Sequence, residues 1–203
     1  MKNVLLQSKI LKVLFVCLFL SNYNAFAQKT TIWVVRHGEK EPATVKTADD
    51  PNLSADGQAR AEALAKFLKR EKIKAIYVTK YKRSIETARP IATQIGLTPA
   101  VYGDSLKTFA ANVLKTHNGD NVLIVGHSNT VMKILDAFGA EMPFDTLDED
   151  DFDMAFKITI KSTGKRELEV RYYGVLHHKS DLPQKYQDDD RPAQQFVTPA
   201  AHY

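Results

Sequence analysis

The segment Thr31–Glu39 reads T-I-W-V-V-R-H-G-E and decides the fold, because it joins a core strand to reactive side chains. Residues 32–35 form a continuous apolar run that favours β structure, which is typical of a strand buried on both faces. The run stops at Arg36, and His37 and Gly38 follow. In an open α/β sheet, ligands bind beyond the carboxyl ends of the strands. We therefore expect this strand to deliver an arginine and a histidine to the ligand-binding edge of a sheet.

The chemistry of these three residues suits a phosphate site. Arg36 carries a planar guanidinium with five donors. His37 titrates near neutral pH, so it can act as a neutral nucleophile or as a general base. Gly38 allows the backbone to approach a ligand closely. A tripeptide is a weak signal, however, and a solvated turn after a core strand explains it equally well. Other segments have to decide between the two interpretations.

Residues 1–27 have the pattern of a secretory signal peptide. The first twelve residues contain three lysines and no acid, residues 13–20 are apolar, and A-F-A precedes Gln28. This pattern predicts a periplasmic or secreted protein that is cleaved before Gln28. An uncleaved membrane anchor would need about 20 apolar residues, and the run here is much shorter. We therefore expect membrane contact only through the transient signal peptide.

Composition limits the partners of the mature chain. Cys17 is the only cysteine, and the bulky Phe15 and Val16 before it disfavour lipoprotein anchoring. Cleavage would leave no thiolate to bind a metal or to act as a nucleophile. The full chain has 28 basic and 24 acidic residues, and removal of the three leader lysines leaves 25 against 24, a net charge of +1. This balance does not indicate nucleic-acid binding, which calls for a concentrated basic face.

The rest of the chain alternates between apolar strands and helical patterns. Helices are predicted from Ser54, which suits an N-cap, to Arg70, and over 84–95, 105–117 and 127–138; strands are predicted at 75–78, 98–101 and 122–125. Residues 155–160 and 167–173 indicate an antiparallel hairpin. The alternation predicts an α/β fold: a three-layer α/β/α sandwich with a mostly parallel central sheet and the hairpin at its edge. We expect the domain to span residues 28–180 and residues 181–203 to form a flexible polar tail.

Two further predicted strands end near basic side chains. The strand at 75–78 is followed by Arg83, at or in the first turn of a helix, where the helix N-terminus already favours anions. A surface ion pair with a neighbour is the alternative role for this arginine. The strand at 122–125 is followed by His127. A single histidine in this position is usually structural, but two strand ends with adjacent glycine and histidine make coincidence a weaker explanation. We expect both residues to meet the arginine and histidine of the first strand.

Other polar groups have more ordinary interpretations. Residues 143–153 are rich in acids but lack the glycine-punctuated alternation of an EF-hand loop, so a solvated loop is expected. His177 and His178 are adjacent, and adjacent strand residues point apart. A metal site at this pair is therefore not expected.

Four motifs, in order along the chain, resemble those of the histidine phosphatase superfamily, which has the phosphoglycerate-mutase-like fold. They read V-V-R-H-G-E-K, L-S-A-D-G-Q-A-R-A, Y-K-R-S-I-E-T-A and V-L-I-V-G-H-S-N-T, and the resemblance covers residues 31–173. It implies that His37 is the phosphorylated nucleophile, that Arg36 and Arg83 grip the phosphate, and that His127 stabilises charge in the transition state. It implies no cofactor and no metal, since two guanidiniums and a second imidazole can neutralise a phosphoryl group.

The proton donor is less well defined by the resemblance. In one branch of the family an aspartate follows the second Gly-His, but Ser128 stands there in this chain. In the other branch the acid lies between the second arginine and the late strand, and Asp104 is the preferred candidate there. Glu39 is the alternative, and a substrate with a good leaving group could also react without a strong acid. Glu39 and Ser128 are further predicted to contact the substrate.

The resemblance implies an exported phosphomonoesterase of the metal-independent histidine acid phosphatase type, acting through phosphohistidine. Export disfavours a mutase, because the glycolytic phosphates on which mutases act are cytosolic. The expected substrate is a small phosphate ester, with phosphorylated envelope sugars as one candidate class. Two alternatives remain: a phosphate- or phosphosugar-binding module with weak or no turnover, and a His/Asp metalloprotein whose activity chelators would remove.

Overall fold

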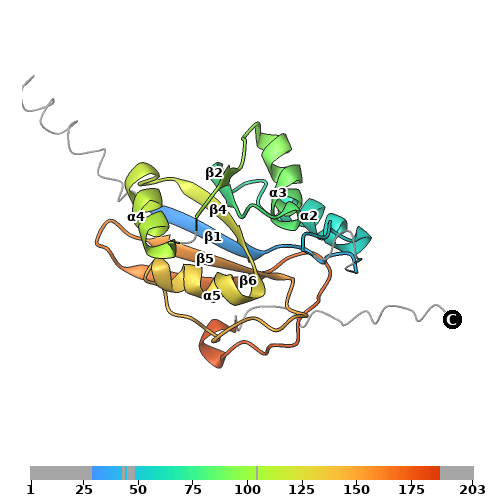
Figure 1. Cartoon of the computed structure of the whole chain (residues 1–203). Coiled ribbons are helices and arrows are strands. Elements are labelled where there is room, and N and C mark those ends of the chain that lie inside the picture. The colour runs from blue at the N-terminus through green and yellow to red at the C-terminus, as the bar shows by residue number, and fades with distance from the viewer. Residues whose placement is uncertain (1–28, 43, 45–48, 104, 188–203) are drawn as a thin grey trace, which may run out of the picture.

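Strand β1 (Thr30–Arg36) is buried at every position in the computed structural model, which describes residues 29–42, 44, 49–103 and 105–187. It lies inside a six-stranded sheet with the order β3-β2-β4-β1-β5-β6 (Figure 1). The parallel strands are β1, β4 (Asn121–Gly126), β2 (Ile73–Val78) and β3 (Ala100–Val101). The antiparallel strands are β5 (Met154–Ile160) and β6 (Arg166–Tyr172), which form the predicted hairpin at the edge.

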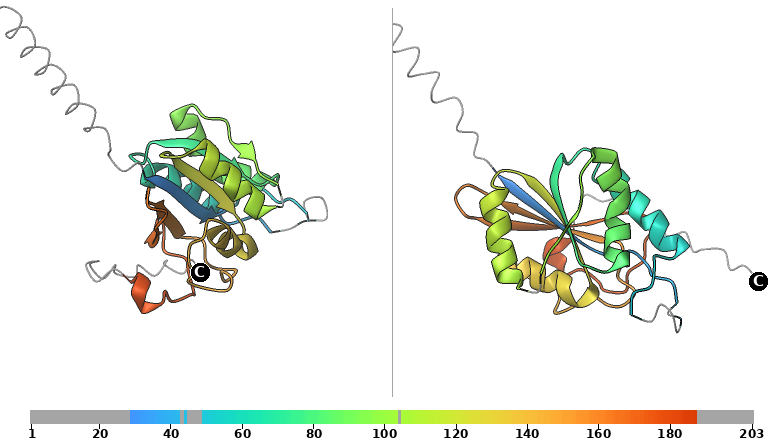
Figure 2. Two further views of the ribbon diagram at one scale, coloured as in Figure 1. Left: turned by 90° about the vertical axis from the view of Figure 1, so that its left-hand side faces the viewer. Right: turned by 45° about the horizontal axis from the view of Figure 1, so that its top comes forward.

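Helices cover both faces of the sheet (Figure 2). Helices α2 (Ala55–Phe67) and α3 (Lys82–Ile95) pack on one face, where they meet Trp33 and Val35. Helices α4 (Leu106–Thr116) and α5 (Ser128–Ala137) pack on the other, where they meet Ile32 and Val34. Successive residues of a strand point to opposite faces, so the apolar run in β1 supplies both cores. The predicted three-layer α/β/α architecture is confirmed.

Local sequence signals explain where the helices start and stop. The Ser54 hydroxyl accepts a hydrogen bond from the Gly57 amide at 3.1 Å and caps α2, as predicted. Gly96 ends α3 in a left-handed conformation with φ of 69°, which glycine adopts without strain. Helix α3 begins at Lys82, two residues before the predicted start, so Arg83 lies in its first turn.

The described chain continues past the predicted start of the tail. Leu182 is 5 % exposed and belongs to the core that α4 and α5 cover. A short 3₁₀ helix (Gln184–Tyr186) follows it. The tail boundary stays a prediction, since residues 188–203 lie outside the described part, as do residues 1–28 with the predicted leader. Within the described ranges, none of the helices combines the length and apolar character needed to cross a bilayer.

Candidate active site

One cavity of about 890 Å³ opens where β1, β2 and β4 end. Arg36, His37, Arg83 and His127 all line this cavity, and Ser128 does so as well. Parallel strands bring their carboxyl ends to one edge of a sheet, which is why residues far apart in sequence meet here. The four basic residues therefore converge as the sequence predicts, while their chemical roles stay predictions.

The side chain of His37 is held in the form that a nucleophile needs. The residue is 3 % exposed, and its Nδ1 lies 2.7 Å from the carbonyl oxygen of Gly38. Because a carbonyl oxygen only accepts, we assign the proton to Nδ1, which leaves a free lone pair on Nε2. Burial, reinforced by the charges of His127 and Arg36, lowers the pKa of His37 to about 3. The imidazole is therefore neutral at neutral pH.

His127 packs against the predicted nucleophile. The ring centroids of His37 and His127 are 5.0 Å apart, with an angle of 65° between their planes. The Nε2 atom of His127 lies 3.0 Å from the hydroxyl oxygen of Thr79. Burial, followed by the charges of Arg83 and Arg36, lowers the pKa of His127 to about 4. Both rings are thus neutral at neutral pH, and neither repels the other electrostatically.

The guanidinium of Arg36 donates hydrogen bonds to a loop, and the residue also lines the cavity. Its Nη1 donates to the backbone oxygens of Asp148 at 2.7 Å, Glu149 at 2.9 Å and Asp151 at 3.3 Å. Its Nη2 donates to Glu149 Oε2 at 3.1 Å, and its Cζ lies 4.0 Å from the centroid of the Phe152 ring. Its Nε is buried and has no hydrogen-bond partner among the described residues. Nη1 therefore anchors a loop, and not all five donors of the guanidinium are available to a ligand.

The side chain of Arg83 is 15 % exposed and lies against Tyr81, whose ring centroid is 4.3 Å from Cζ. Its Nη1 is 3.7 Å from an oxygen of Asp50. Its Nε, like that of Arg36, is buried without a hydrogen-bond partner in the described part of the chain. Leaving such donors unpaired costs free energy unless a ligand satisfies them. Two unpaired guanidinium N–H groups beside one cavity therefore indicate an anion-binding site.

Buried hydroxyls on α3 hold the strand ends in place. The Thr87 hydroxyl accepts from the Gly38 amide at 2.9 Å. The Ser84 hydroxyl donates to the Val125 carbonyl and accepts from the Thr79 amide, each at 3.1 Å. Both side chains are fully buried. These residues were not singled out from the sequence, although a spacing of three places them on the same helical face, toward the sheet.

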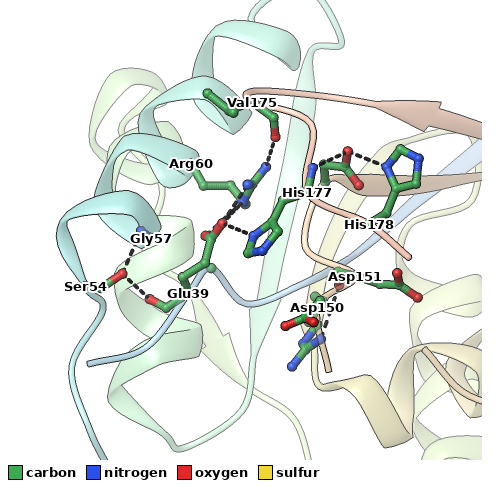
Figure 3. Close-up of polar contacts among 12 residues, drawn as sticks. Glu39, Ser54, Gly57, Arg60, Asp150, Asp151, Val175, His177 and His178 are labelled. Carbon is green, nitrogen blue, oxygen red and sulfur yellow. Dashed lines mark hydrogen bonds and ion pairs between the residues drawn. The ribbon is translucent and has the colours of Figure 1, made fainter. Parts of the chain in front are cut away.

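Glu39 is the alternative proton donor and a predicted substrate contact. Its carboxylate is bound by Arg60 and His177 (Figure 3). Arg60 donates to its carboxylate from Nε and from Nη2, the latter at 2.6 Å, and His177 Nδ1 lies 3.1 Å from the same oxygen. Burial alone would raise the pKa of Glu39, but Arg60 outweighs burial and lowers it. Glu39 is also absent from the lining of the cavity. A paired, ionised carboxylate is a poor proton donor, so the structure argues against both predicted roles.

The acidic segment 143–153 is not simply a solvated loop, which corrects the sequence-based expectation. Asp151 is fully buried and accepts hydrogen bonds from the backbone amides of Lys179 at 2.8 Å and Ser180 at 3.1 Å. The reason is topological: β5 runs antiparallel to β1, so the residues before β5 return to the edge where β1 ends. The period-two pattern of β5, continued backwards to Asp151, was the available signal.

The two adjacent histidines bind two different carboxylates. His177 Nδ1 contacts Glu39, whereas His178 Nδ1 lies 2.7 Å from an oxygen of Asp153, which also accepts from the His177 amide at 3.0 Å (Figure 3). Over the described ranges, no group of three or more His, Cys, Asp or Glu side chains is arranged to hold a metal ion.

Glu149 brings a carboxylate to the cavity that was not proposed from the sequence. Its side chain is 74 % exposed, and it accepts from the Ser128 hydroxyl at 2.9 Å while pairing with Arg36. The preferred proton donor, Asp104, lies outside the described residues, and its neighbour Gly103 lines the cavity. Glu149 is far from the family motifs in sequence, so only the fold reveals it.

Comparisons with known proteins agree with this geometry. Residues 32–107 match the family model of the histidine phosphatase superfamily (branch 1). Similar solved structures include the protein histidine phosphatase SixA complexed with tungstate, with a TM-score of 0.56 and 17 % identity over 68 % of this chain and 93 % of that chain. A mycobacterial glucosyl-3-phosphoglycerate phosphatase matches with a TM-score of 0.53 and 14 % identity over 69 % and 97 % of the two chains.

A phosphoserine phosphatase from Entamoeba histolytica, in complex with 3-phosphoglyceric acid, matches with a TM-score of 0.52 and 16 % identity over 78 % of this chain and 100 % of that chain. Identities this low establish the shared fold and not a shared substrate. The matched residues include the strand and loop that carry Arg36 and His37, and the helix start that carries Arg83. The chain therefore has the fold of these phosphatases, and its residues 32–107 resemble the histidine phosphatase superfamily (branch 1).

Proposed function

We propose that the chain is an exported phosphomonoesterase that hydrolyses phosphate esters through a phosphohistidine on His37. The observation that carries this proposal is the pairing of His37 Nδ1 with a carbonyl oxygen, beside two guanidiniums whose Nε atoms have no hydrogen-bond partner among the described residues. The first feature leaves a nucleophilic lone pair on Nε2. The second supplies donors for the oxygens of a phosphoryl group.

The reaction takes place in two displacements. In the first, His37 Nε2 forms a bond to phosphorus while the bond to the ester oxygen breaks, and a carboxylic acid gives that oxygen a proton. In the second, water attacks the phosphohistidine, the carboxylate takes the water proton, and inorganic phosphate leaves as Nε2 is regenerated. Arg36 and Arg83 balance the charge that spreads over the equatorial oxygens.

His127 acts on the same phosphoryl oxygens. In the structure its pKa is lowered to about 4, mainly by burial. A phosphate dianion beside the ring favours the charged imidazolium and so raises this pKa again. His127 can therefore take up a proton as the substrate binds and stabilise the transition state as a cation.

Two carboxylates compete for the proton-transfer role. Asp104 is supported by its place in the sequence, next to a residue that lines the cavity. Glu149 is supported by its position, because its exposed carboxylate touches both Arg36 and Ser128. Replacing each with alanine and comparing esters of good and poor leaving groups identifies the acid. Loss of the acid slows the poor leaving group more, since that oxygen needs the proton.

The phosphatases with similar structures are named for different phosphorylated compounds, so they support phosphoryl chemistry without selecting a substrate. We propose a periplasmic or secreted location on the strength of the N-terminal leader pattern. Phosphorylated envelope sugars are substrates that an exported enzyme would meet.

The decisive experiment is to trap the intermediate. Mixing the mature chain with a ³²P-labelled ester and quenching within milliseconds should yield an acid-labile, alkali-stable label on His37. His37→Ala should lose the label and lower kcat by about 10³-fold or more. His117→Asn is the matched control, because His117 lies outside the cavity and bonds to Tyr77 and Asp120. Phosphate binding without label or turnover would favour the binding-module alternative instead.

A further inference from the structure

The edge of the sheet opposite the cavity carries a group of exposed cations. The parallel strands start there in register, since Thr31 of β1 and Ile73 of β2 both align with Asn121 of β4. Strand β5 ends at the same edge, because Ile160 pairs with Thr30. The segments next to these strand ends contain six exposed basic residues, which we call the basal edge: Lys29, Lys69, Arg70, Lys72, Lys161 and Lys165.

Most of the charge of the basal edge is not neutralised. Its four members in residues 29–72 make no ion pair with another described residue. Lys161 and Lys165 share one carboxylate, that of Glu167, at distances of 2.7 Å and 2.9 Å. One shared carboxylate leaves this pair of lysines with a net positive charge as well.

Local stability explains only part of this pattern. Basic side chains just after a helix interact favourably with the dipole of the helix, which is reason enough for Lys69 and Arg70 after α2. Lys29 lies next to a strand and at no helix end. The described connections that lead into β2, β4 and β6 contain two acids, Glu71 and Asp120, and both are half-buried. The edge therefore presents a net positive surface to solvent, for which the fold alone gives no reason.

The form of the basal edge suits a flat partner. It extends from β2 across β4, β1 and β5 to β6, which is four strand spacings or about 20 Å. A protein interface usually has an apolar or aromatic centre. The exposed large apolar side chains in the described part of the chain lie outside these connections; they are Ile85, Val101, Met142 and Val175. An extended line of cations without an apolar centre indicates binding to a charged surface.

The chemistry of the side chains and their place in the chain select a lipid surface. Flexible ammonium groups attract anionic headgroups without one fixed geometry. The predicted leader ends before Gln28, so it joins the folded body next to Lys29, within the basal edge. Export on such a leader brings this edge next to the bilayer. The cavity opens at the other end of the strands, where it stays accessible from solvent.

We propose that the basal edge binds membranes that contain anionic phospholipids, reversibly and without insertion, with the cavity facing away from the bilayer. The sequence alone predicts membrane contact only through the leader, whereas this surface acts after the leader has been removed. The proposal uses none of the residues assigned to phosphoryl transfer. Its outcome is therefore independent of the phosphatase assignment.

Sedimentation with sucrose-loaded vesicles tests the proposal on the chain that starts at Gln28, which retains every described residue. At about 0.1 M NaCl the chain should bind vesicles of phosphatidylglycerol and phosphatidylcholine, and it should not bind phosphatidylcholine alone. Binding should be lost at about 1 M NaCl, where screening shortens the range of the charges to about 3 Å. The triple variant Lys69→Gln, Arg70→Gln, Lys72→Gln should bind about 100-fold more weakly, because each cation near an anionic surface changes the partition coefficient about fivefold.

The matched control removes the same charge from the opposite end of the strands. It is the triple variant Lys80→Gln, Lys82→Gln, Lys107→Gln, at exposed lysines that follow β2 and β3. This variant should bind within about threefold of the wild-type chain, because its charges lie more than a Debye length of about 10 Å from the bilayer. Circular dichroism melting of both triple variants shows that a loss of binding is not a loss of fold.

The orientation is measured with a dye on one introduced cysteine, because the chain from Gln28 has no cysteine of its own. Energy transfer to a labelled lipid should be stronger from Ser162→Cys, in the turn between β5 and β6, than from Asn129→Cys, which lines the cavity. Equal transfer from both sites, or equal losses of binding in the two triple variants, overturns the proposal. Absence of binding to the phosphatidylglycerol vesicles refutes it as well, and salt-sensitive binding to duplex DNA alone would assign the edge to a nucleic acid instead.

Discussion

His37 and His127 make the stability of the folded chain depend on pH. Their pKa values are lowered to about 3 and about 4, in both cases mainly by burial, against an ordinary value of 6.5. Between these values and 6.5, the unfolded chain binds protons that the folded chain does not. Stability therefore rises with pH in this window and is lost as the pH falls from 6.5 toward 4.

Replacing His37 by asparagine should weaken this dependence. His37→Asn should reduce the loss of unfolding free energy between pH 7.5 and pH 4.5 by about 2 kcal/mol, because one buried proton acceptor is removed. Urea unfolding at the two pH values measures this loss. An equally steep dependence in His37→Asn would show that other groups titrate in this range.

At the scale of the elements, the start of α2 lies backbone to backbone against the loop after β1, at two glycines. A Cβ at Gly57 would lie 2.0 Å from the Glu39 carbonyl oxygen, and a Cβ at Gly38 would lie 2.8 Å from the Gly57 carbonyl oxygen. Contacts below 3.0 Å with backbone atoms cannot relax cheaply. The pair of glycines thus sets how close the helix lies to the loop that carries His37.

Gly57→Ala should therefore be severe. Pushing α2 away from Glu39 disturbs buried packing, and we expect a loss of about 3 kcal/mol or more of unfolding free energy. Thermal unfolding followed by circular dichroism is the measurement. Gly103→Ala is the control, since a Cβ at that glycine meets nothing within 4 Å. Similar melting temperatures for Gly57→Ala and the wild type would mean that the helix can shift without cost.

The segment 175–180 supports Arg36 through one buried carboxylate. Asp151 accepts from the amides of Lys179, Ser180 and Asp148, the last at 2.8 Å, while its own carbonyl lies 3.3 Å from Arg36 Nη1. The pKa of Asp151 is lowered because these hydrogen bonds outweigh burial, which would raise it. The carboxylate thus ties the loop that anchors Arg36 to a distant part of the chain.

Asp151→Asn should weaken both the fold and the site. An amide replaces one accepting oxygen by an N–H donor, which leaves at least one backbone amide unpaired at a cost of about 1–3 kcal/mol. Displacement of the loop should also raise KM more than it lowers kcat, because the proposed role of Arg36 is to bind the phosphate. Steady-state kinetics together with urea unfolding tests both effects. Asp150→Asn, at a half-exposed neighbour whose surface ion pair with Lys179 contributes little stability, should change neither, and equal effects in the two variants would contradict this role for Asp151.

At the scale of the whole molecule, local sequence patterns predicted which side chains meet at the ends of the parallel strands. The apolar runs that end in Arg36 and His127 identified the parallel core, and parallel strands fix which ends meet. The contacts of Glu39 with Arg60, and of Asp151 with the segment near Lys179, could not be predicted. They join residues 21 and 28 positions apart, and no periodic pattern encodes such pairings.

The predicted cleavage site lies close in sequence to the first strand of the described structure. Strand β1 begins at Thr30, and the Thr30 hydroxyl already accepts a hydrogen bond from the Gly119 amide at 2.8 Å. Cleavage before Gln28 would therefore leave only two residues ahead of the sheet. Cleavage at a position after Thr30 would remove part of a buried strand. The fold therefore limits how far along the chain a signal peptidase could cut.

The processed chain should begin at Gln28 when the full sequence is expressed in a Gram-negative host. Signal peptidases require small residues at the positions that Ala25 and Ala27 occupy, so Ala27→Phe should block cleavage and leave the chain attached to the membrane fraction. Intact-mass measurement of the periplasmic and membrane fractions distinguishes the two products. Asn24→Gln should be processed like the wild type. Recovery of the full-length wild-type chain from the cytosol would refute export, and with it the argument that envelope phosphates are within reach of the enzyme.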